Sequence, residues 1–227
     1  MATRSLLADL AADSAARCGV AVRFESQGGV AAAWRVAAGE AFDVVVLTAD
    51  VLATLAADGH LRAPSILPVA ISPAALAIRS GAPRPVIARD VDLYAALRQA
   101  GRIGYSTGPS GTALLARLDR AGLLAELKPR LVLAPVGVPV ATLLREGAAD
   151  VAIQQLSELA DRDGVEVVGP LPPGVAIDTT FSAAVAEQAA DPGAAYDFIA
   201  YLTSPQVHGA IRRAHMAPAG ITPGETA

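Results

Sequence analysis

Short apolar runs alternate along the chain with stretches of helical spacing. Residues 1–16 place Leu6, Leu7 and Leu10 on one stripe and charged side chains off it, which predicts an amphipathic helix. Apolar runs that predict strands occupy residues 20–24, 44–47, 103–104, 131–133 and 150–153. Helical patterns occupy residues 30–38, 51–57, 112–121, 138–145 and 194–202. Continuous apolar strands between helices are typical of a mainly parallel sheet covered on both faces, so the sequence predicts an α/β fold.

The order of strand, small-residue loop, helix, Asp-Val strand and helix occurs twice. The first copy begins near Val22 and the second near Leu131. This repetition favours two similar lobes, each with a mainly parallel sheet flanked by helices, over one continuous sheet. Residues 69–78 and 175–185 are extended segments that can cross between the lobes. We therefore expect a discontinuous lobe 1 (residues 1–72 plus 180–227) and a lobe 2 (residues 73–179), joined by two hinge segments.

A loop of small and hydroxyl residues precedes the helix predicted at 112–121. Backbone N–H groups at a helix N-terminus lack partners within the helix, and the helix dipole favours negative charge there. The loop lacks the Lys-Ser/Thr pair that ends a nucleotide-binding P-loop. It predicts either a site for a small anion or carboxylate, or an ordinary helix cap made by Thr107 or Ser110. Its candidate ligand-binding residues are Tyr105, Ser106, Thr107, Ser110 and Gly111.

Further candidate loops follow strands at matching points of the two lobes. Because open α/β sheets bind ligands beyond the carboxyl ends of their strands, we expect these loops to meet in the cleft between the lobes. A Gln amide can donate to a ligand carboxylate or accept from a hydroxyl. We interpret Asp50 as a helix N-cap, since a carboxylate would repel an anion. The remaining candidate ligand-binding residues are Ser26, Gln27, Gly28 and Thr48 in lobe 1, and Val138, Gln154 and Gln155 in lobe 2.

The search for catalytic chemistry yields no complete set. The three histidines lie away from the candidate loops, no metal-ligand spacing occurs, and Cys18 is the single cysteine. The loop at 108–111 lacks the Gly-x-Ser-x-Gly spacing of a nucleophile elbow. As general acid or base we can nominate Tyr105 and Glu158, with Asp50 and Glu25 as alternatives. We expect no metal and no cofactor.

Composition and charge restrict the kinds of partner that the protein can bind. The 227 residues are 53% apolar, which supports a packed core and excludes disorder. The mean hydropathy of +0.43 does not indicate a membrane span, because prolines interrupt the longest uncharged stretch, residues 63–78. The net charge is −4 and no Arg-rich run occurs, so we expect neither nucleic acid nor membrane insertion. We expect a monomer that binds a small anionic ligand.

The order of several short motifs resembles the molybdate-type extracellular solute-binding proteins. The motifs are Ser26-Gln27-Gly28-Gly29, the segment Gly39 to Asp50, Gly104-Tyr105-Ser106, Asp150-Val151-Ala152-Ile153 and the segment Phe198 to Ser204. The resemblance covers most of the chain, about residues 6–218. It implies the type II periplasmic-binding-protein fold, in which two α/β lobes close on an oxyanion or small carboxylate. It also implies a permease of an ABC transporter as partner.

This sequence departs from that family in two ways. Family members open with a strand whose following loop supplies a ligand-binding Ser, whereas the first helix here is predicted from about Ala2. We expect the true start to lie upstream with an export signal, which implies a periplasmic protein; as written, the chain would be cytoplasmic. The second departure is that Gln154-Gln155 replace a Tyr that contacts molybdate in the family, so an organic carboxylate becomes a better candidate.

Two functions are therefore compatible with the sequence. The leading hypothesis is the substrate-binding protein of an ABC-type transporter. The alternative is an isomerase of a small tricarboxylate on the same scaffold, because a subgroup of the family is similar to aconitate isomerase. That enzyme moves a double bond within its substrate and needs a base near a carbon acid.

Overall fold

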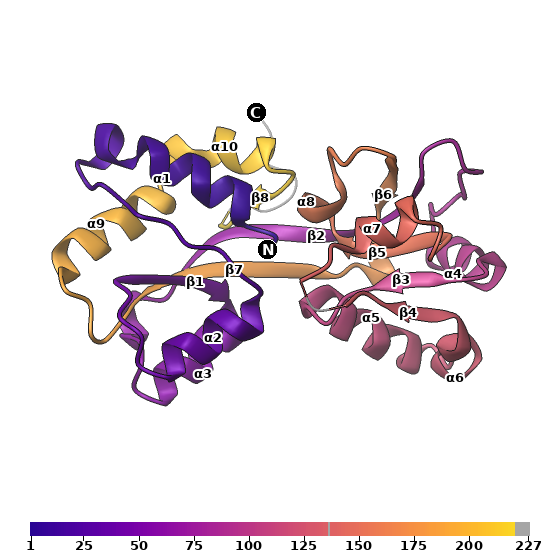
Figure 1. The fold of residues 1–227 in the computed structure, drawn as a ribbon, viewed down its shortest axis with the longest axis horizontal. Coiled ribbons are helices and arrows are strands. Elements are labelled where there is room, and N and C mark those ends of the chain that lie inside the picture. Colours follow the sequence, from indigo (N-terminus) through magenta and orange to yellow (C-terminus); the bar gives the residue numbers. More distant parts are fainter. Residues whose placement is uncertain (136, 221–227) are drawn as a thin grey trace. The chain divides into compact units, whose positions relative to one another are not determined.

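The computed structural model describes residues 1–135 and 137–220. The chain divides into two compact units: unit 1 comprises Met1–Ser72 and Thr180–Ala227, and unit 2 comprises Pro73–Thr179. Two strands, β2 (Leu67–Arg79) and β7 (Asp178–Val185), continue from one unit into the other along the chain. The expected α/β class is confirmed, since helices flank a sheet in each unit (Figure 1).

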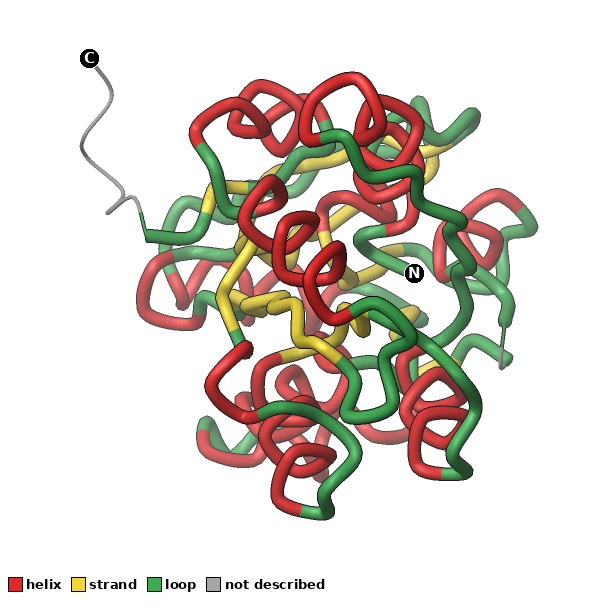
Figure 2. The backbone as a smooth tube through the Cα atoms, turned by 90° about the vertical axis from the view of Figure 1, so that its left-hand side faces the viewer, coloured by secondary structure: helices red, strands yellow, loops and turns green. Residues whose placement is uncertain are grey.

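Unit 1 consists of a sheet covered by helices on both faces. Strand β7 lies between β1 and β2 in the sheet, and β8 pairs with β2. Successive residues of β7 point to opposite faces, so Ala183 and Val185 pack under α1, α9 and α10, whereas Ala184 packs with α2 and α3. Figure 2 shows helices (red) on both sides of these strands (yellow). The elements are α1 (Arg4–Cys18), α2 (Gly29–Ala37), β1 (Val44–Thr48), α3 (Ala49–Ala57), η1 (Ala63–Ser65), α9 (Pro192–Leu202), η4 (Pro205–Val207), α10 (His208–Arg213) and β8 (Ala217–Pro218).

Unit 2 is built on the strand order β6-β2-β5-β3-β4. One apolar cluster joins Leu76 and Ile153 to α4, α5 and α6, and a second joins Ala152 to α7 on the opposite face. The elements are α4 (Asp90–Gln99), β3 (Ile103–Tyr105), α5 (Pro109–Arg120), α6 (Leu124–Leu127), η2 (Lys128–Arg130), β4 (Leu131–Leu133), α7 (Val140–Arg145), β5 (Val151–Gln155), α8 (Leu156–Leu159), β6 (Val165–Pro170) and η3 (Pro173–Val175).

The expectation of a mainly parallel sheet in each lobe is only partly correct. Strand β3 pairs in parallel with β4 and β5. Strands β2 and β5, β2 and β6, β1 and β7, and β2 and β8 pair antiparallel. The apolar runs of β2 and β7 could not reveal direction, because a strand buried on both faces has the same composition in either orientation. Among the described residues, the parallel pairs β3–β4 and β3–β5 both lie in unit 2.

Residues 20–24, predicted as a strand, form no strand in the structure. The predicted alternation is present, because Val20, Val22 and Phe24 pack against the core of unit 1 while the residues between them are exposed. Burial on one side requires an extended chain but not a partner strand. The segment therefore lies extended on the core without joining the sheet ladder.

Candidate functional site

The carboxyl ends of three strands of unit 2 lie at one edge of its sheet. The parallel register sets Ile103 opposite both Leu131 and Val151, so β3 and β4 end at the same level and β5 continues two residues further in the same direction. The loops that leave this edge include the predicted site residues Tyr105, Ser106, Thr107 and Val138. Ligands of α/β proteins bind outside this edge of a sheet.

Helix α5 begins at this edge with an uncapped N-terminus. Gly108 is its N-cap residue, and no side chain caps the helix within the described part of the chain. The alternative in which Thr107 or Ser110 caps its own helix is therefore wrong. Ser110 is only 1% exposed, and its backbone N–H has no acceptor among the described residues. The first turn of α5 thus keeps a donor available at the positive end of the helix dipole.

Gly111 allows α5 to approach the preceding loop closely. A Cβ atom at this position would lie 1.7 Å from the Ser106 carbonyl oxygen and 2.8 Å from its carbonyl carbon. The Ser106 hydroxyl in turn accepts a hydrogen bond of 3.2 Å from the Gly108 N–H. Only glycine fits here, so the loop and the first turn of α5 form one tightly packed surface.

Gln155, the last residue of β5, lies on the α5 side of the sheet. It shares the face of Ile153, two residues earlier, which packs in the cluster that contains Leu114 of α5. Gln155 is 2% exposed, and its Nε2 donates a 2.6 Å hydrogen bond to Thr179 Oγ1. Its Oε1 is buried and has no partner among the described residues. A buried acceptor without a donor costs about 1–3 kcal/mol, so this oxygen is a candidate ligand contact.

Gln154 belongs to a separate pair on the opposite face. It shares the face of Ala152, which packs against α7. Gln154 Nε2 donates a 2.8 Å hydrogen bond to Glu158 Oε2 on α8. Burial raises the pKa of the Glu158 carboxyl above its usual range because ionisation is disfavoured away from water. The side chains of Gln154 and Gln155 therefore lie in different environments, although the sequence predicted both as ligand-binding residues.

The raised pKa of Glu158 predicts a pH-dependent stability. A carboxyl with a raised folded-state pKa contributes its full stability below the unfolded pKa, and the contribution is lost as the pH rises through the folded pKa. We therefore expect Glu158→Gln to raise the thermal midpoint relative to wild type at about pH 8 and to change it little at about pH 4. Thermal unfolding across this range measures the difference. Asp178→Asn, at an exposed carboxyl, is the control, and a Glu158→Gln gain that is equal at both pH values would contradict the prediction.

The predicted residues of unit 1 lie in loops that open helices. Ser26 and Gln27 are half-buried, and Gly28 is the N-cap residue of α2. Thr48 ends β1, is buried and is the N-cap residue of α3. Neither helix has a side-chain cap among the described residues. These N-termini resemble that of α5 in offering backbone donors.

Asp50 does not take the capping role expected of it, and Glu25 lies in an ion pair. Asp50 is not the N-cap of α3, because Thr48 takes that place and Asp50 stands exposed in the first turn. The shift has a simple cause: the strand ends at Thr48, so the helix begins at Ala49, two residues earlier than expected. Glu25 pairs at 3.0 Å with Arg35, which also bonds to Glu40. Glu25 is therefore engaged in a surface ion pair.

The other predicted residues of unit 2 differ in exposure. Tyr105 is half-buried against the core, and its carbonyl accepts from the Ala134 N–H at 2.8 Å. Thr107 and Val138 are exposed. Sequence reasoning missed Thr179, which holds the Gln155 amide. No local signal could have identified it, since 24 residues separate the two and only the folded strands bring them together.

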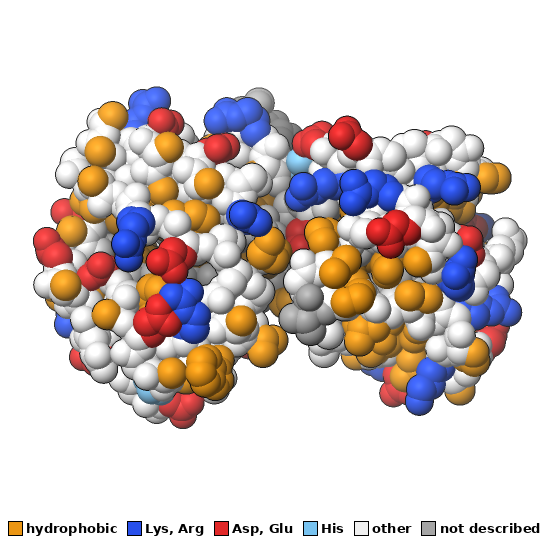
Figure 3. Space-filling view, viewed as in Figure 1, with side chains coloured by type: hydrophobic (Ala, Val, Ile, Leu, Met, Phe, Trp, Pro, Cys, Tyr) orange, Lys and Arg blue, Asp and Glu red, His pale blue; other side chains and the backbone are white. Residues whose placement is uncertain are grey.

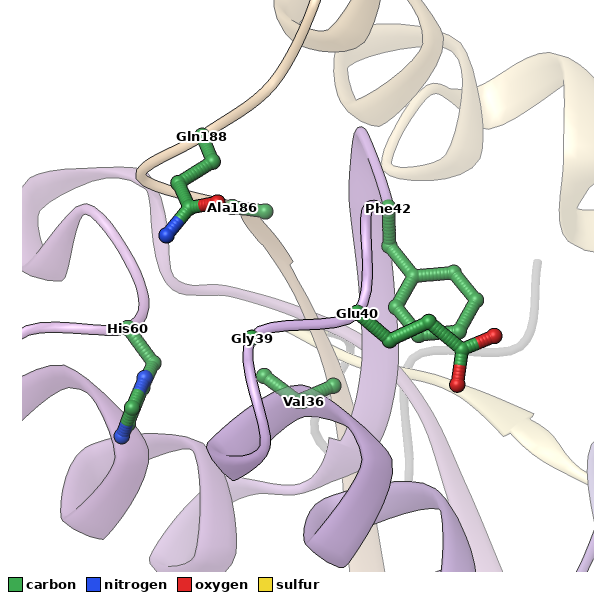
Figure 4. Close-up of a pocket in the computed structure, with 7 residues that line it drawn as sticks. All are labelled: Val36, Gly39, Glu40, Phe42, His60, Ala186 and Gln188. Carbon is green, nitrogen blue, oxygen red and sulfur yellow. The ribbon is translucent and has the colours of Figure 1, made fainter.

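Two pockets formed by described residues of unit 1 contain none of the predicted site residues. The pocket of Figure 4, between α2, the loop at Gly39–Phe42, His60 and Ala186, has a volume of about 20 Å³. That space holds about one water molecule. A more open pocket of about 410 Å³ is lined by Arg17, Cys18, Asp197, Ala200, Tyr201, Ser204 and Gln206.

The fold and the donor-rich loops define a class of protein, the two-unit α/β solute-binding proteins. A profile of that class matches nearly the whole chain. The chain belongs to the bacterial extracellular solute-binding protein family, whose profile matches residues 1–217. The resemblance expected from the motifs is thereby confirmed.

Relatives include both a catalytic and a binding protein. The chain is 30% identical to the aconitate isomerase of Pseudomonas sp over 195 residues, which cover 83% of this chain and 72% of the relative. The Azotobacter vinelandii periplasmic molybdate-binding protein has a TM-score of 0.75 and 20% identity, covering 95% of each chain. Peb3 from Campylobacter jejuni has a TM-score of 0.71 and 19% identity, also covering 95% of each chain. These structural likenesses show the fold.

Membership of this family places the chain among bacterial extracellular proteins that bind solutes. Among the described residues, no helix combines the length and the apolar character needed to span a bilayer. On the face shown in Figure 3, basic and acidic side chains are mixed on unit 1, whereas basic side chains (blue) form a row along the upper part of unit 2. Hydrophobic side chains (orange) gather there over α2 and α3, where Val30 and Trp34 are largely exposed.

Proposed function

We propose that this solute-binding protein takes a small carboxylate or oxyanion and that the N-terminus of α5 binds its negative charge. The observation that carries the proposal is the uncapped first turn of α5, where the Ser110 N–H has no acceptor among the described residues. The uncapped helices of unit 1, which begin at Gly29 and Ala49, offer similar donors. Chain segments 105–112 and 134–139 contain no Lys or Arg, so backbone and hydroxyl donors would supply the recognition.

The energetics of such donors are sufficient for transport. Hydrogen bonds to a charged group each contribute about 1.5–3 kcal/mol. Four or five of them would reach roughly −8 kcal/mol, which corresponds to micromolar affinity. A neutral donor set also lets the ligand leave, because no buried ion pair must be broken. The protein would deliver this ligand to the permease of an ABC transporter, outside the cytoplasm and in the periplasm where the cell has one.

A thermal-shift panel tests the proposal. Saturating ligand at 100 times its dissociation constant stabilises a protein by about 2.7 kcal/mol, so we expect a clear shift with at least one of molybdate, sulfate, phosphate, succinate, malate, citrate and trans-aconitate. Ser110→Leu should abolish the shift, because the larger side chain covers the α5 donors. Thr112→Leu, exposed on the same helix, should preserve it. No shift with any compound, or an unchanged shift in Ser110→Leu, would contradict the proposal.

The isomerase is the second candidate function. Two observations favour it: the 30% identity to aconitate isomerase and the half-buried Glu158, whose raised pKa suits a group that exchanges a proton with carbon. The trans-aconitate samples of the panel provide its test, by following cis-aconitate over time. Formation of the cis isomer at a rate that Glu158→Gln reduces would support catalysis. Stable binding of trans-aconitate without turnover would leave transport as the function.

A further inference from the structure

The chemistry of Gln155 restricts the class of ligand. Its Nε2 is occupied by Thr179 Oγ1 at 2.6 Å, which turns Oε1 away from that partner. Oε1 is buried and lacks a donor among the described residues, although a buried carbonyl normally receives at least one hydrogen bond. The group that satisfies it must carry a hydrogen. A fully deprotonated oxyanion such as molybdate has none to give.

The donor end of the site lies on the same face. Gln155 and α5 share the side of the sheet defined by Ile153 and Leu114, and both stand at the carboxyl edge of the parallel strands. The first turn of α5 offers N–H groups and a positive dipole. One ligand could therefore use both ends of this face. A group that donates a hydrogen bond would meet Gln155 Oε1, and a group that accepts hydrogen bonds would meet the N–H groups of α5.

We propose that the ligand is a small hydroxycarboxylate, whose carboxylate binds at the N-terminus of α5 and whose hydroxyl donates a hydrogen bond to Gln155 Oε1. This inference rests on the proposed anion-binding function and specifies its substrate class. Gln155 is then a specificity-determining residue. The neighbouring Gln154 also has a buried Oε1 without a partner among the described residues. It lies on the opposite face of the sheet, beside Glu158 and α7 rather than α5, so we do not assign it this role.

Matched acids that differ by one hydroxyl test the inference directly. Calorimetric titration of the wild-type protein would compare malate with succinate, citrate with tricarballylate, and lactate with propionate. In at least one pair we expect the hydroxy acid to bind about 10- to 100-fold more tightly, which is the range for leaving one neutral buried acceptor unpaired. Molybdate and sulfate should bind more weakly than that hydroxy acid.

Two variants at adjacent positions separate recognition from structure. Gln155→Met removes the acceptor at nearly constant volume and should reduce the preference for the hydroxy acid to less than about threefold. Gln154→Met is the matched control and should retain the wild-type preference. Equal or tighter binding of the deoxy acids by the wild-type protein would overturn the inference while leaving the anion site intact. Absence of binding by every acid and oxyanion would instead refute the proposed function.

Discussion

Gly111→Ala should weaken ligand binding strongly while Gly108→Ala, three residues away in the same loop, leaves it intact. The Cβ that the first substitution introduces would stand 1.7 Å from the Ser106 carbonyl oxygen, and the atoms it meets are backbone, which cannot rotate aside. Either the first turn of α5 or the loop at Ser106 must therefore move. Overpacking of this kind costs about 1–3 kcal/mol or more in stability. The displaced donors should lower affinity by about 100-fold, equivalent to two steps of about 1.4 kcal/mol.

Gly108 provides a stringent control because it lies in the same loop. A Cβ there meets only the Ser106 hydroxyl, at 3.4 Å, and its φ of −73° and ψ of −178° are open to alanine. Calorimetric titration with the ligand found in the panel measures affinity, and urea unfolding measures stability. Trp34, the single tryptophan, gives a fluorescence signal for unit 1 in the same samples. Wild-type affinity in Gly111→Ala would show that α5 does not bind the ligand.

The class of fold was predictable because it depends on periodicity. The apolar runs at 44–47, 131–133 and 150–153 coincide with β1, β4 and β5. Burial on both faces explains the run in β5, whereas β1 and β4 are only partly buried. Strand direction was not predictable, because it depends on partners distant in the chain. Residues 20–24 show the same limit in another form. The alternation of apolar and polar residues there indicates contact with the core on one side. It does not indicate whether a partner strand is present, which depends on the rest of the folded chain.

The candidate site was predictable where it depends on local sequence and unpredictable elsewhere. The loop before α5 could be predicted to offer backbone N–H donors, because glycine and small residues stand directly before a helix start. The difference between Gln154 and Gln155 requires the direction of each side chain, and Thr179 requires a contact across strands. Glu158 was nominated from its position, but its raised pKa comes from burial that sequence cannot display. The proposed role of Gln155 in specificity therefore depends on tertiary contacts, whereas the proposed anion site depends mainly on local sequence.

Leu76→Ala should cost far more stability than Leu67→Ala, although both leucines lie on β2. Leu76 is fully buried at the centre of unit 2, opposite Ile153 of β5 and Gly169 of β6. Truncation there removes buried methyl groups and leaves a cavity, which costs about 2–5 kcal/mol. Leu67, at the start of the same strand, is 42% exposed. Its truncation should cost less than about 1 kcal/mol, because water already contacts the side chain.

The loss of stability in Leu76→Ala should be located in unit 2, around β5 and β6. Because chains with two compact units often unfold in more than one step, urea unfolding should be combined with hydrogen exchange of peptides from β5 and β6. We expect faster exchange in both strands in Leu76→Ala and wild-type exchange in Leu67→Ala. A loss at β5 would also loosen Gln155 at the end of that strand, so the same variant should weaken ligand binding. A cost below about 1 kcal/mol for Leu76→Ala would mean that the core of unit 2 is packed differently around β2.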